Sequence, residues 1–361
     1  MRNKRSINMY NYRRRRKRRN HARGKIYKRL RIGFWILFAT VIVLGLGIFS
    51  ALRFSGEKKI EKEINRPKQT EEGVEEDLVY SDGKTYRYLE NSINILFMGI
   101  DKEGDMSQIK ETGGMGQADA VFLLSMNLDS ERIRMIAIPR ETVVPVEVYD
   151  RNGLYKETRD EQIALQFAYG QDEKKSCELM ADAVSHLCYQ VPIHKYIAMN
   201  MGILPELNDV VGGVRIQADE QVKEMFPDAE TGRFYRLHGE EAVTYLQSRD
   251  SSQFASSMDR LERQKQYILG FILAARLQMQ DDTSLPLNLY EQFKGNYTTN
   301  LSADEFTYLA AQAAEMTFSE RSLFVVPGEM VQDEVYEKYQ VDDDGLFDTV
   351  LDVFYERVRG Y

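Results

Sequence analysis

AVFLLSMNLDSERIRMIAI, residues 120–138, contains two apolar runs separated by a short polar segment. The runs, 120–126 and 133–138, have the length and the large apolar content of buried strands. The segment between them, NLDSE at 127–131, is rich in residues that favour chain reversal. The stretch therefore predicts two core strands joined by a tight turn.

Outward from this stretch, strand and helix patterns alternate. A third apolar run, INILFMGI at 93–100, has strand length. Ser302 and Glu305 form a capping-box pattern at the start of one helix. Helices are expected at 160–169, 173–188, 203–211, 238–249, 257–278, 303–316 and 346–357, and further strands at 194–200 and 214–217. Strands interspersed with helices predict an α/β domain.

The charges are strongly segregated along the chain. Residues 1–31 carry 15 of the 48 Lys/Arg and no Asp or Glu. The other 33 Lys/Arg stand against 56 Asp/Glu, so the remainder has a net charge of −23. RRRRKRR, 13–19, fits a nucleic-acid patch or a topology signal that lies on anionic lipid. The second is favoured, because an acidic body repels nucleic acid.

The apolar segment IGFWILFATVIVLGLGIFSAL, 32–52, has 21 residues and no charge. As a helix it spans roughly 30 Å of hydrocarbon. It exceeds the usual apolar region of a cleaved signal peptide, which is the alternative. We expect a single N-terminal transmembrane helix, with 1–31 in the cytoplasm and 53–361 outside the cell membrane.

The rest of the chain divides by composition. Residues 53–85 include the charged stretch 57–77 and are expected to form an extracytoplasmic stalk. The folded domain is expected at 86–280, and a C-terminal α/β extension at 281–361 is expected to pack on it.

The two cysteines, Cys177 and Cys188, lie eleven residues apart in or near one helical pattern. On a continuous helix this is roughly 16 Å, too far for a disulfide. The four histidines are scattered, so no zinc site or Cys–His nucleophile is indicated. We expect both cysteines to be small core residues.

Charged residues stand where apolar structure ends. Asp101, Asp119 and Arg140 border the three apolar runs, and Arg260 and Arg263 share a face in the first turn of a predicted helix. Taken singly, each is most simply solvated or salt-bridged. As a set, two carboxylates suit Mg²⁺, and arginines suit phosphate through their bidentate fork. The set therefore favours a pyrophosphate site.

Several ordered blocks between residues 90 and 278 carry a more specific signal. They are NILFMGID (94–101), ADAVFLLSMN (118–127), MIAIPRET (135–142), FAYG (167–170), VPIHKYIAMNMGILPELNDVVGGVRI (191–216), LHGEEAVTYLQSR (237–249) and DRLERQ (259–264). In this order, after an apolar segment, they resemble the LytR-CpsA-Psr (LCP) family of Gram-positive envelope proteins.

The resemblance implies an LCP-type α/β domain, with a central mixed β-sheet flanked by helices and an apolar tunnel for a polyprenyl chain. Members attach a glycopolymer, such as teichoic acid or capsule, to peptidoglycan from an undecaprenyl-pyrophosphate carrier. The reaction makes a phosphodiester and releases the lipid phosphate. The implied partners are the polyprenyl-pyrophosphate-linked glycan, peptidoglycan and membrane lipid, with no nucleic acid.

The resemblance also assigns roles to residues. Asp101 and Asp119 match the aspartates that bind Mg²⁺, the implied cofactor. The positions that match the catalytic arginines are Arg140, Arg249, Arg260 and Arg263. The glutamines expected to contact substrate are Gln117, Gln247 and Gln264.

The chain departs from the family pattern at five positions. Glu103, Gln117 and Gln247 stand where the family usually has arginine, and Gln162 and Ala164 replace a lysine and an asparagine. At least three positive charges are missing, and each charged hydrogen bond to phosphate is worth about 1.5–3 kcal/mol.

Two functions stay open at this point. One is a membrane-anchored phosphotransferase. The other is a catalytically impaired homologue that binds polyprenyl lipid or wall polymer, or acts as a scaffold, and the lost arginines favour it. Transcriptional regulation is disfavoured, because the folded domain is expected on the far side of the membrane.

Overall fold

The computed structural model describes residues 47, 49–65, 78–102, 106, 112, 114–250, 252–333 and 336–358. The basic tail, most of the expected transmembrane segment and Glu103 lie outside these ranges. Within them, the structure contains no helix long and apolar enough to cross a membrane. Residues 53–361 form one compact unit, and the following description concerns it.

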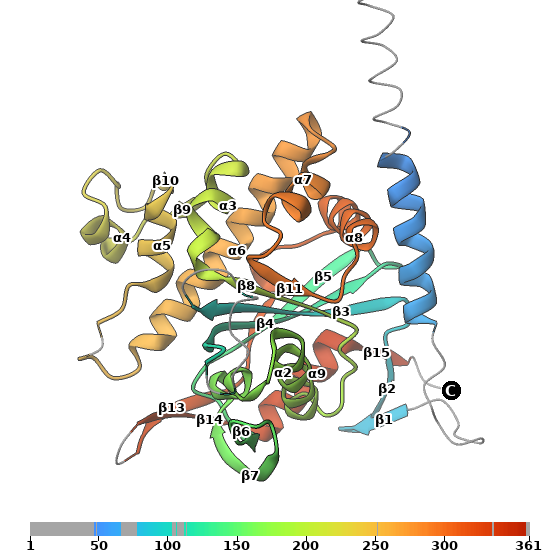
Figure 1. Ribbon diagram of the computed structural model, residues 1–361, viewed down its shortest axis with the longest axis vertical. Helices are drawn as coiled ribbons and strands as arrows, with labels where there is room; N and C mark the ends of the chain where they lie inside the picture. Colours follow the sequence, from blue (N-terminus) through green and yellow to red (C-terminus); the bar gives the residue numbers. More distant parts are fainter. Residues whose placement is uncertain are drawn as a thin grey trace, which may run out of the picture. The chain divides into compact units, whose positions relative to one another are not determined.

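A six-stranded mixed sheet forms the centre of this unit (Figure 1). Its strand order is β11-β8-β3-β4-β5-β12. The strands are β3 (Ser92–Asp101), β4 (Gln117–Asn127), β5 (Arg132–Ile138), β8 (Lys195–Asn200), β11 (Tyr297–Thr299) and β12 (Leu323–Val325). Strands β3, β4 and β5 pair antiparallel, whereas β8 and β12 run parallel to β3 and β5. The three predicted core strands are thus confirmed.

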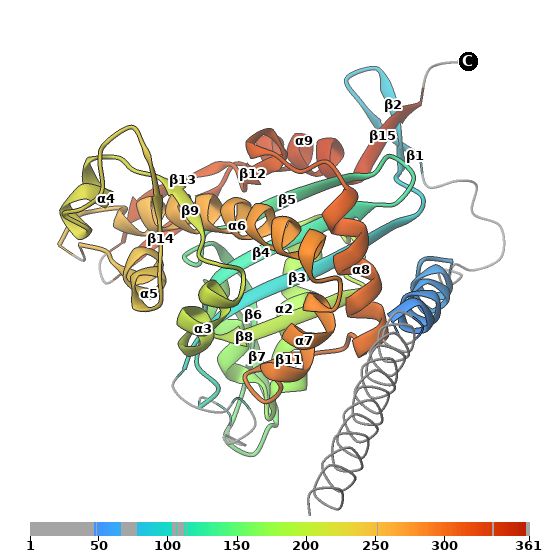
Figure 2. The same cartoon turned by 90° about the horizontal axis from the view of Figure 1, so that it is seen from above.

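Helices cover both faces of the sheet (Figures 1 and 2). On one face, α2 (Glu173–Leu187) and α9 (Asp343–Phe354) close a core with the alternate residues of β3–β5. Figure 2 shows α6 crossing above β4 and β5 on the other face. The helices on that face are α6 (Ser256–Asp281), α7 (Leu285–Gln292) and α8 (Ala303–Glu315). Both predicted core cysteines are confirmed, since Cys177 and Cys188 are buried and free.

A third apolar cluster lies beside the sheet. It packs α3 (Leu204–Val210), α4 (Glu220–Met225) and α5 (Glu240–Gln247) with the hairpin β9 (Arg215–Gln217) and β10 (Phe234–Arg236). The remaining pairs are β6 (Val143–Tyr149) with β7 (Tyr155–Gln162), and β13 (Gly328–Gln332) with β14 (Glu337–Val341). Strands β1 (Leu78–Ser81), β2 (Lys84–Tyr88) and β15 (Tyr355–Val358) form a small sheet. The short 3₁₀ turns are η2 (Ile163–Tyr169), η3 (Met201–Ile203) and η4 (Glu320–Ser322).

Two helix predictions need correction. The expected helix 160–169 is the end of β7 followed by η2, because residues through Gln162 pair with β6. The expected helix 346–357 starts earlier, as α9, and its last residues form β15 against β2. In both places long-range pairing overrides the local period. The C-terminal region supplies β11 and β12 of the central sheet.

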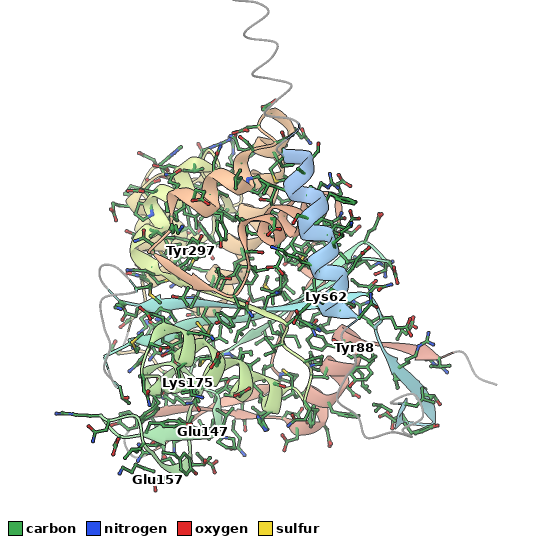
Figure 3. All side chains as sticks on the ribbon, turned by 45° about the vertical axis from the view of Figure 1, so that its right-hand side comes forward. Lys62, Tyr88, Glu147, Glu157, Lys175 and Tyr297 are labelled. Carbon is green, nitrogen blue, oxygen red and sulfur yellow. The ribbon has the colours of Figure 1, made fainter. Side chains whose placement is uncertain are left out.

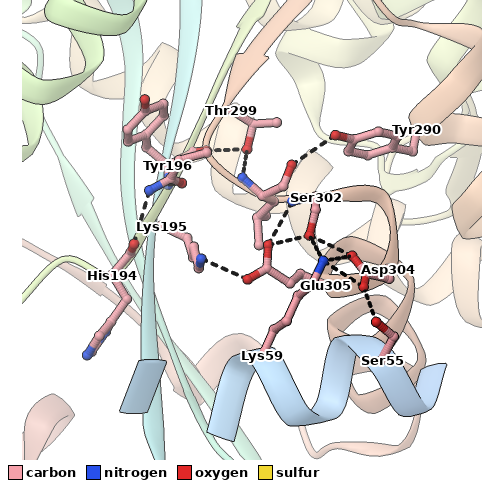
Figure 4. Close-up of polar contacts among 12 residues, drawn as sticks. Ser55, Lys59, His194, Lys195, Tyr196, Tyr290, Thr299, Ser302, Asp304 and Glu305 are labelled. Atoms are coloured by element: carbon pink, nitrogen blue, oxygen red, sulfur yellow. Dashed lines mark hydrogen bonds and ion pairs between the residues drawn. The ribbon is translucent and has the colours of Figure 1, made fainter. Parts of the chain in front are cut away.

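The segment expected to be a stalk begins with a packed helix. Residues 53–64 are helical, and Ile60 is fully buried in the same cluster as α8. Lys59 donates to Asp304 at 2.8 Å and Ser55 donates to the same carboxylate at 2.5 Å (Figure 4). Although burial raises the pKa of Asp304, hydrogen bonds from Lys59, Ser302 and Ser55 more than offset this and leave it well below its usual range. The helix is therefore part of the folded unit.

Gly56 allows this helix to approach α8. A Cβ added there would lie 2.1 Å from the backbone oxygen of Asp304. We expect Gly56→Leu to lower the free energy of unfolding by about 1–3 kcal/mol, since an overpacked contact must open. Denaturant unfolding of the full chain measures the change. Lys62→Leu, on an exposed position of the same helix, is the matched control, and equal effects of the two variants would contradict the close packing (Figure 3).

Candidate active site

A β-bulge between β3 and β4 sets the direction of Asp119. Gly99 pairs with Ala120 and Ile100 pairs with Ala118, so Asp119 is the extra residue on β4. Ala118 packs into the core on the α2 side, whereas Ala120 faces α6. A bulge re-aims side chains in this way and often lies beside a functional site. Asp119 is thereby placed on the α6 side of the sheet edge.

Arg140 closes an ionic cluster with Asp119. It follows β5, and its Nη1 donates to Asp119 Oδ1 while its Nη2 donates to Gln117 Oε1 at 2.6 Å. Its Nε makes no hydrogen bond with the residues that the structure describes and lies 3.6 Å from the buried carboxylate of Glu141. The guanidinium is mostly buried, at 18% side-chain exposure. It is therefore held between acceptors with one donor group unused.

Arg260 reaches the same carboxylate from α6. Its Nη1 lies 3.4 Å from Asp119 Oδ2, and the residue is buried. Burial lowers the pKa of Arg260; Asp119 partly offsets this, and Arg140 and Arg249 lower it further. Arg249, exposed in the loop after α5, is thus close enough to add positive charge. Of the four predicted arginines, the structure brings Arg140 and Arg260 together at Asp119.

Arg263 is occupied elsewhere. Its Nε donates to the carbonyl of Tyr245 at 2.9 Å, its Nη2 to the carbonyl of Ser248, and its Nη1 to Gln221 at 3.2 Å. Burial lowers its pKa. A cation at the end of α5 satisfies the terminal carbonyls of that helix. In this arrangement Arg263 positions α5 and the loop to Arg249, and it does not join the cluster at Asp119.

The other predicted site residues spread around this cluster. Asp101 is exposed at the end of β3 and pairs with Gln117 across the sheet. Gln247 is exposed at the last position of α5. Gln264 is buried on α6, one turn beyond Arg260. Sequence reasoning missed Glu141, although it directly follows Arg140.

An apolar cavity of about 300 Å³ lies between the sheet and α6, α7 and α8. Its walls come from alternate residues of β3, β4, β5 and β8 and from the facing sides of the helices. Apart from Tyr267, whose hydroxyl is buried without a partner in the described chain, the polar residues of its lining are Gln264 and Arg276. Arg276 is anchored on the carbonyls of Ala313 and Met316 at the end of α8. The interior therefore suits a hydrocarbon ligand.

The cavity borders the charged cluster. Ala120, next to Asp119, lines it, and so does Gln264, one turn along α6 from Arg260. The lining continues along the helix to Ala275 and Met279. At 1.5 Å per residue, the path from Arg260 to Met279 is roughly 28 Å. Cluster and cavity together form a site for a ligand with a charged head and a long apolar tail.

Comparison with known proteins gives this arrangement its family. The model of the LytR_cpsA_psr family matches residues 52–350. The chain belongs to the LytR-CpsA-Psr family. Among similar relatives of this family is the polyisoprenyl-teichoic acid–peptidoglycan teichoic acid transferase TagU of Bacillus cereus, 23% identical over 279 residues, or 76% of this chain and 81% of TagU. TagU of Halalkalibacterium halodurans is 24% identical over 241 residues, which are 67% of this chain and 70% of that TagU.

Solved structures share the LytR-CpsA-Psr fold. TagT of B. subtilis superposes with a TM-score of 0.53 at 17% identity, over 73% of this chain and 90% of TagT. A structure described as TagT bound to LI-WTA gives 0.56 at 17% identity, over 80% of this chain and 96% of that one. At these identities the likeness shows the fold, which is the predicted mixed sheet flanked by helices.

The carboxylates bear on the Mg²⁺ expected for this LytR-CpsA-Psr chain. Within the described ranges, no three His, Cys, Asp or Glu side chains are grouped as metal ligands. Mg²⁺ needs only one or two carboxylates when waters and phosphate oxygens complete its shell. Asp101 and Asp119 fit that set, standing at the ends of paired strands. Both oxygens of Asp119 face arginines, so a metal ion bound there would share these oxygens with Arg140 and Arg260.

Proposed function

We propose that this chain is a membrane-anchored, extracytoplasmic phosphotransferase. It attaches a glycopolymer of the teichoic-acid or capsule kind to peptidoglycan from an undecaprenyl-pyrophosphate carrier. The observation that carries the proposal is the junction of the Asp119–Arg140–Arg260 cluster with the apolar cavity along α6. The names of its relatives support the same activity.

The geometry assigns a role to each part of the junction. The polyprenyl chain fills the cavity, and its pyrophosphate lies at the cluster, where Arg140 and Arg260 donate to phosphate oxygens. The Nε of Arg140 is buried and faces Glu141 at 3.6 Å, so the donors left for phosphate are on its two Nη atoms. Fixed cations in a dry site stabilise charge that develops on the leaving group.

The proposed reaction exchanges one phosphorus–oxygen bond for another. A peptidoglycan hydroxyl oxygen bonds to the phosphorus that carries the polymer, and the bond to the lipid phosphate breaks. The electron pair stays with the lipid phosphate, whose charge Arg140 and Arg260 hold, and the hydroxyl proton is released to solvent. When bound by Asp101 and Asp119, Mg²⁺ supplies further neutralisation of phosphate charge.

A second candidate is a homologue that binds the carrier lipid without transferring polymer. The observation that favours it is the bond from Arg140 to Gln117, a position where an arginine was expected. There an acceptor replaces a donor and occupies part of the Arg140 fork. The same cavity would then serve storage or presentation of the lipid.

A transfer assay separates the two. The full chain in detergent is incubated with a lipid-pyrophosphate glycan, a peptidoglycan oligomer and Mg²⁺, and products are followed by mass spectrometry. The proposal expects a glycan–peptidoglycan phosphodiester and free lipid phosphate, both lost in Asp119→Ala. Arg151→Ala, on an exposed turn, is the matched control. Lipid retained without any product would instead establish the binding homologue.

The cavity makes its own prediction. Ala275 lines it, whereas Leu273 on the same helix is 46% exposed. We expect Ala275→Trp to reduce co-purified polyprenyl lipid by at least about tenfold, because the indole occupies space that the chain needs. Mass spectrometry of extracts from protein made in a bacterium with polyprenyl carriers measures it. Leu273→Trp should leave the amount unchanged, and equal retention by both variants would place the lipid elsewhere.

A further inference from the structure

A second hollow, of about 440 Å³, lies at the opposite end of the β4–β5 hairpin. The end of α9 and strands β2 and β15 form its other walls. Strand β5 separates the two ends, and its six residue steps are about 20 Å long. The hollow is thus distinct from the candidate active site.

Cations converge on the hollow from two sheets. On the hairpin, Ser125 pairs with Arg134 and Asn127 with Arg132, so these alternate residues share one face. On the small sheet, Tyr86 pairs with Arg357, and Lys84 follows on the same face of β2. Strand register therefore turns Arg132, Arg134, Lys84 and Arg357 toward one space.

Few carboxylates balance these four cations. The lining holds two, Asp352 and Glu356, and Glu356 is already paired with Arg87 at 2.6 Å. In the described chain, the side chains of Lys84, Arg132 and Arg357 make no hydrogen bond or salt bridge. The chain beyond residue 31 has a net charge of −23. A local excess of positive charge is therefore unexpected there and calls for an anionic ligand.

The floor of the hollow is polar. Ser125 is 3% exposed, lines the hollow, and its hydroxyl has no hydrogen-bond partner within the described ranges. The hydroxyl is accessible from the hollow, so it can donate to a ligand there. Arg134 donates to the carbonyl of Asp352, which holds its guanidinium at the wall. The site thus presents cationic and hydroxyl donors to one ligand.

We propose that this hollow binds a phosphate ester carried by a soluble glycan or polyol chain. Arginine forks and a hydroxyl suit phosphate oxygens. The volume lies in the range of ligand pockets and exceeds what one anion alone requires, so a sugar or polyol unit fits beside the phosphate. Tyr86 and Tyr355 add aromatic surface to the lining.

A soluble chain fits better than a membrane surface. A membrane is recognised by a broad basic face or by apolar side chains that insert, and the strongly acidic body opposes an anionic surface. A recessed hollow admits a single unit of a flexible chain. The hollow would then be a second contact for the transferred polymer, about 20 Å or more from Arg140. That role rests on the proposed function, whereas the binding of a phosphate ester does not.

The test uses the full chain in detergent and a synthetic glycerol-phosphate oligomer that carries a photoreactive group. Mass spectrometry locates the cross-linked peptides. We expect cross-links in β2 and β15 that fall at least about tenfold in Arg132→Gln/Arg357→Gln, since two charged contacts are lost. Both positions are exposed, so the fold is retained. Arg151→Gln is the matched control.

Further arms decide the origin of the signal. Arg140→Ala should keep the cross-links, which separates this site from any failure of transfer, and a neutral oligosaccharide should give none. Cross-links confined to the basic tail, or unchanged in the double variant, would overturn the proposal. The proposal would also be overturned if phosphatidylglycerol vesicles with a photoreactive headgroup labelled β2 and β15 and the oligomer did not.

Discussion

Arg140→Ala is expected to lower polymer transfer by about 10²–10³-fold, the effect typical of removing one donor that stabilises transition-state charge. The side chain is mostly buried between Asp119, Gln117 and Glu141. Bulk water therefore does not readily take over the role of the lost guanidinium. Its loss also leaves Asp119 with only the longer contact to Arg260. The transfer assay measures the effect, with thermal unfolding as a check on the fold.

A conservative variant sharpens this prediction. Arg140→Lys keeps the charge but loses the planar fork, so we expect activity between wild type and Arg140→Ala. Full activity in Arg140→Ala would mean that the cluster does not hold the reacting phosphate.

Lys195→Met is expected to lower the free energy of unfolding by about 3–5 kcal/mol at neutral pH, because it leaves a buried carboxylate without its cation. Lys195 on β8 lies 3.0 Å from Glu305 of α8, and both side chains are less than 10% exposed (Figure 4). Glu305 also accepts from the Ser302 backbone at 2.8 Å and from its hydroxyl at 2.6 Å. The pair joins the sheet to the helix that covers it.

The effect should depend on pH in a defined direction. Burial raises the pKa of Glu305, but hydrogen bonds from Ser302 and Lys195 more than offset this and lower it. A carboxyl with a lowered folded pKa contributes stability above its unfolded pKa, about 4.3, and loses it as the pH falls further. The difference between wild type and Lys195→Met should therefore narrow below about pH 4.

Chemical denaturation at several pH values measures this difference. Lys195→Met/Glu305→Gln is the control, and it should recover part of the loss because the unpaired charge is gone. A constant difference across pH would show that lost packing, and not the charge, causes the destabilisation.

Local patterns predicted much of this fold. The apolar runs became β3, β4 and β5, and the Ser302–Glu305 capping box starts α8 as predicted. The helix periods at α2, α5 and α6 were correct to within a few residues. These features depend on near neighbours in the chain, which sequence displays directly.

Features set by distant pairing escaped prediction. The bulge that turns Asp119 toward α6 depends on the register of β3 against β4, and β15 forms only because β2 is present. The three-residue spacing of Arg260 and Arg263 predicted a shared ligand, yet their guanidinium groups reach opposite ways, to Asp119 and to the end of α5. Spacing places side chains on one helix face, but packing chooses their partners.

The central claim is that one amphiphilic ligand occupies both the cluster and the cavity. The most direct test is the affinity of the full chain in detergent for geranylgeranyl pyrophosphate, compared among wild type, Arg140→Ala and Ala275→Trp. The account predicts that both variants weaken binding, the first through the pyrophosphate and the second through the chain. Wild-type affinity in either variant would contradict it.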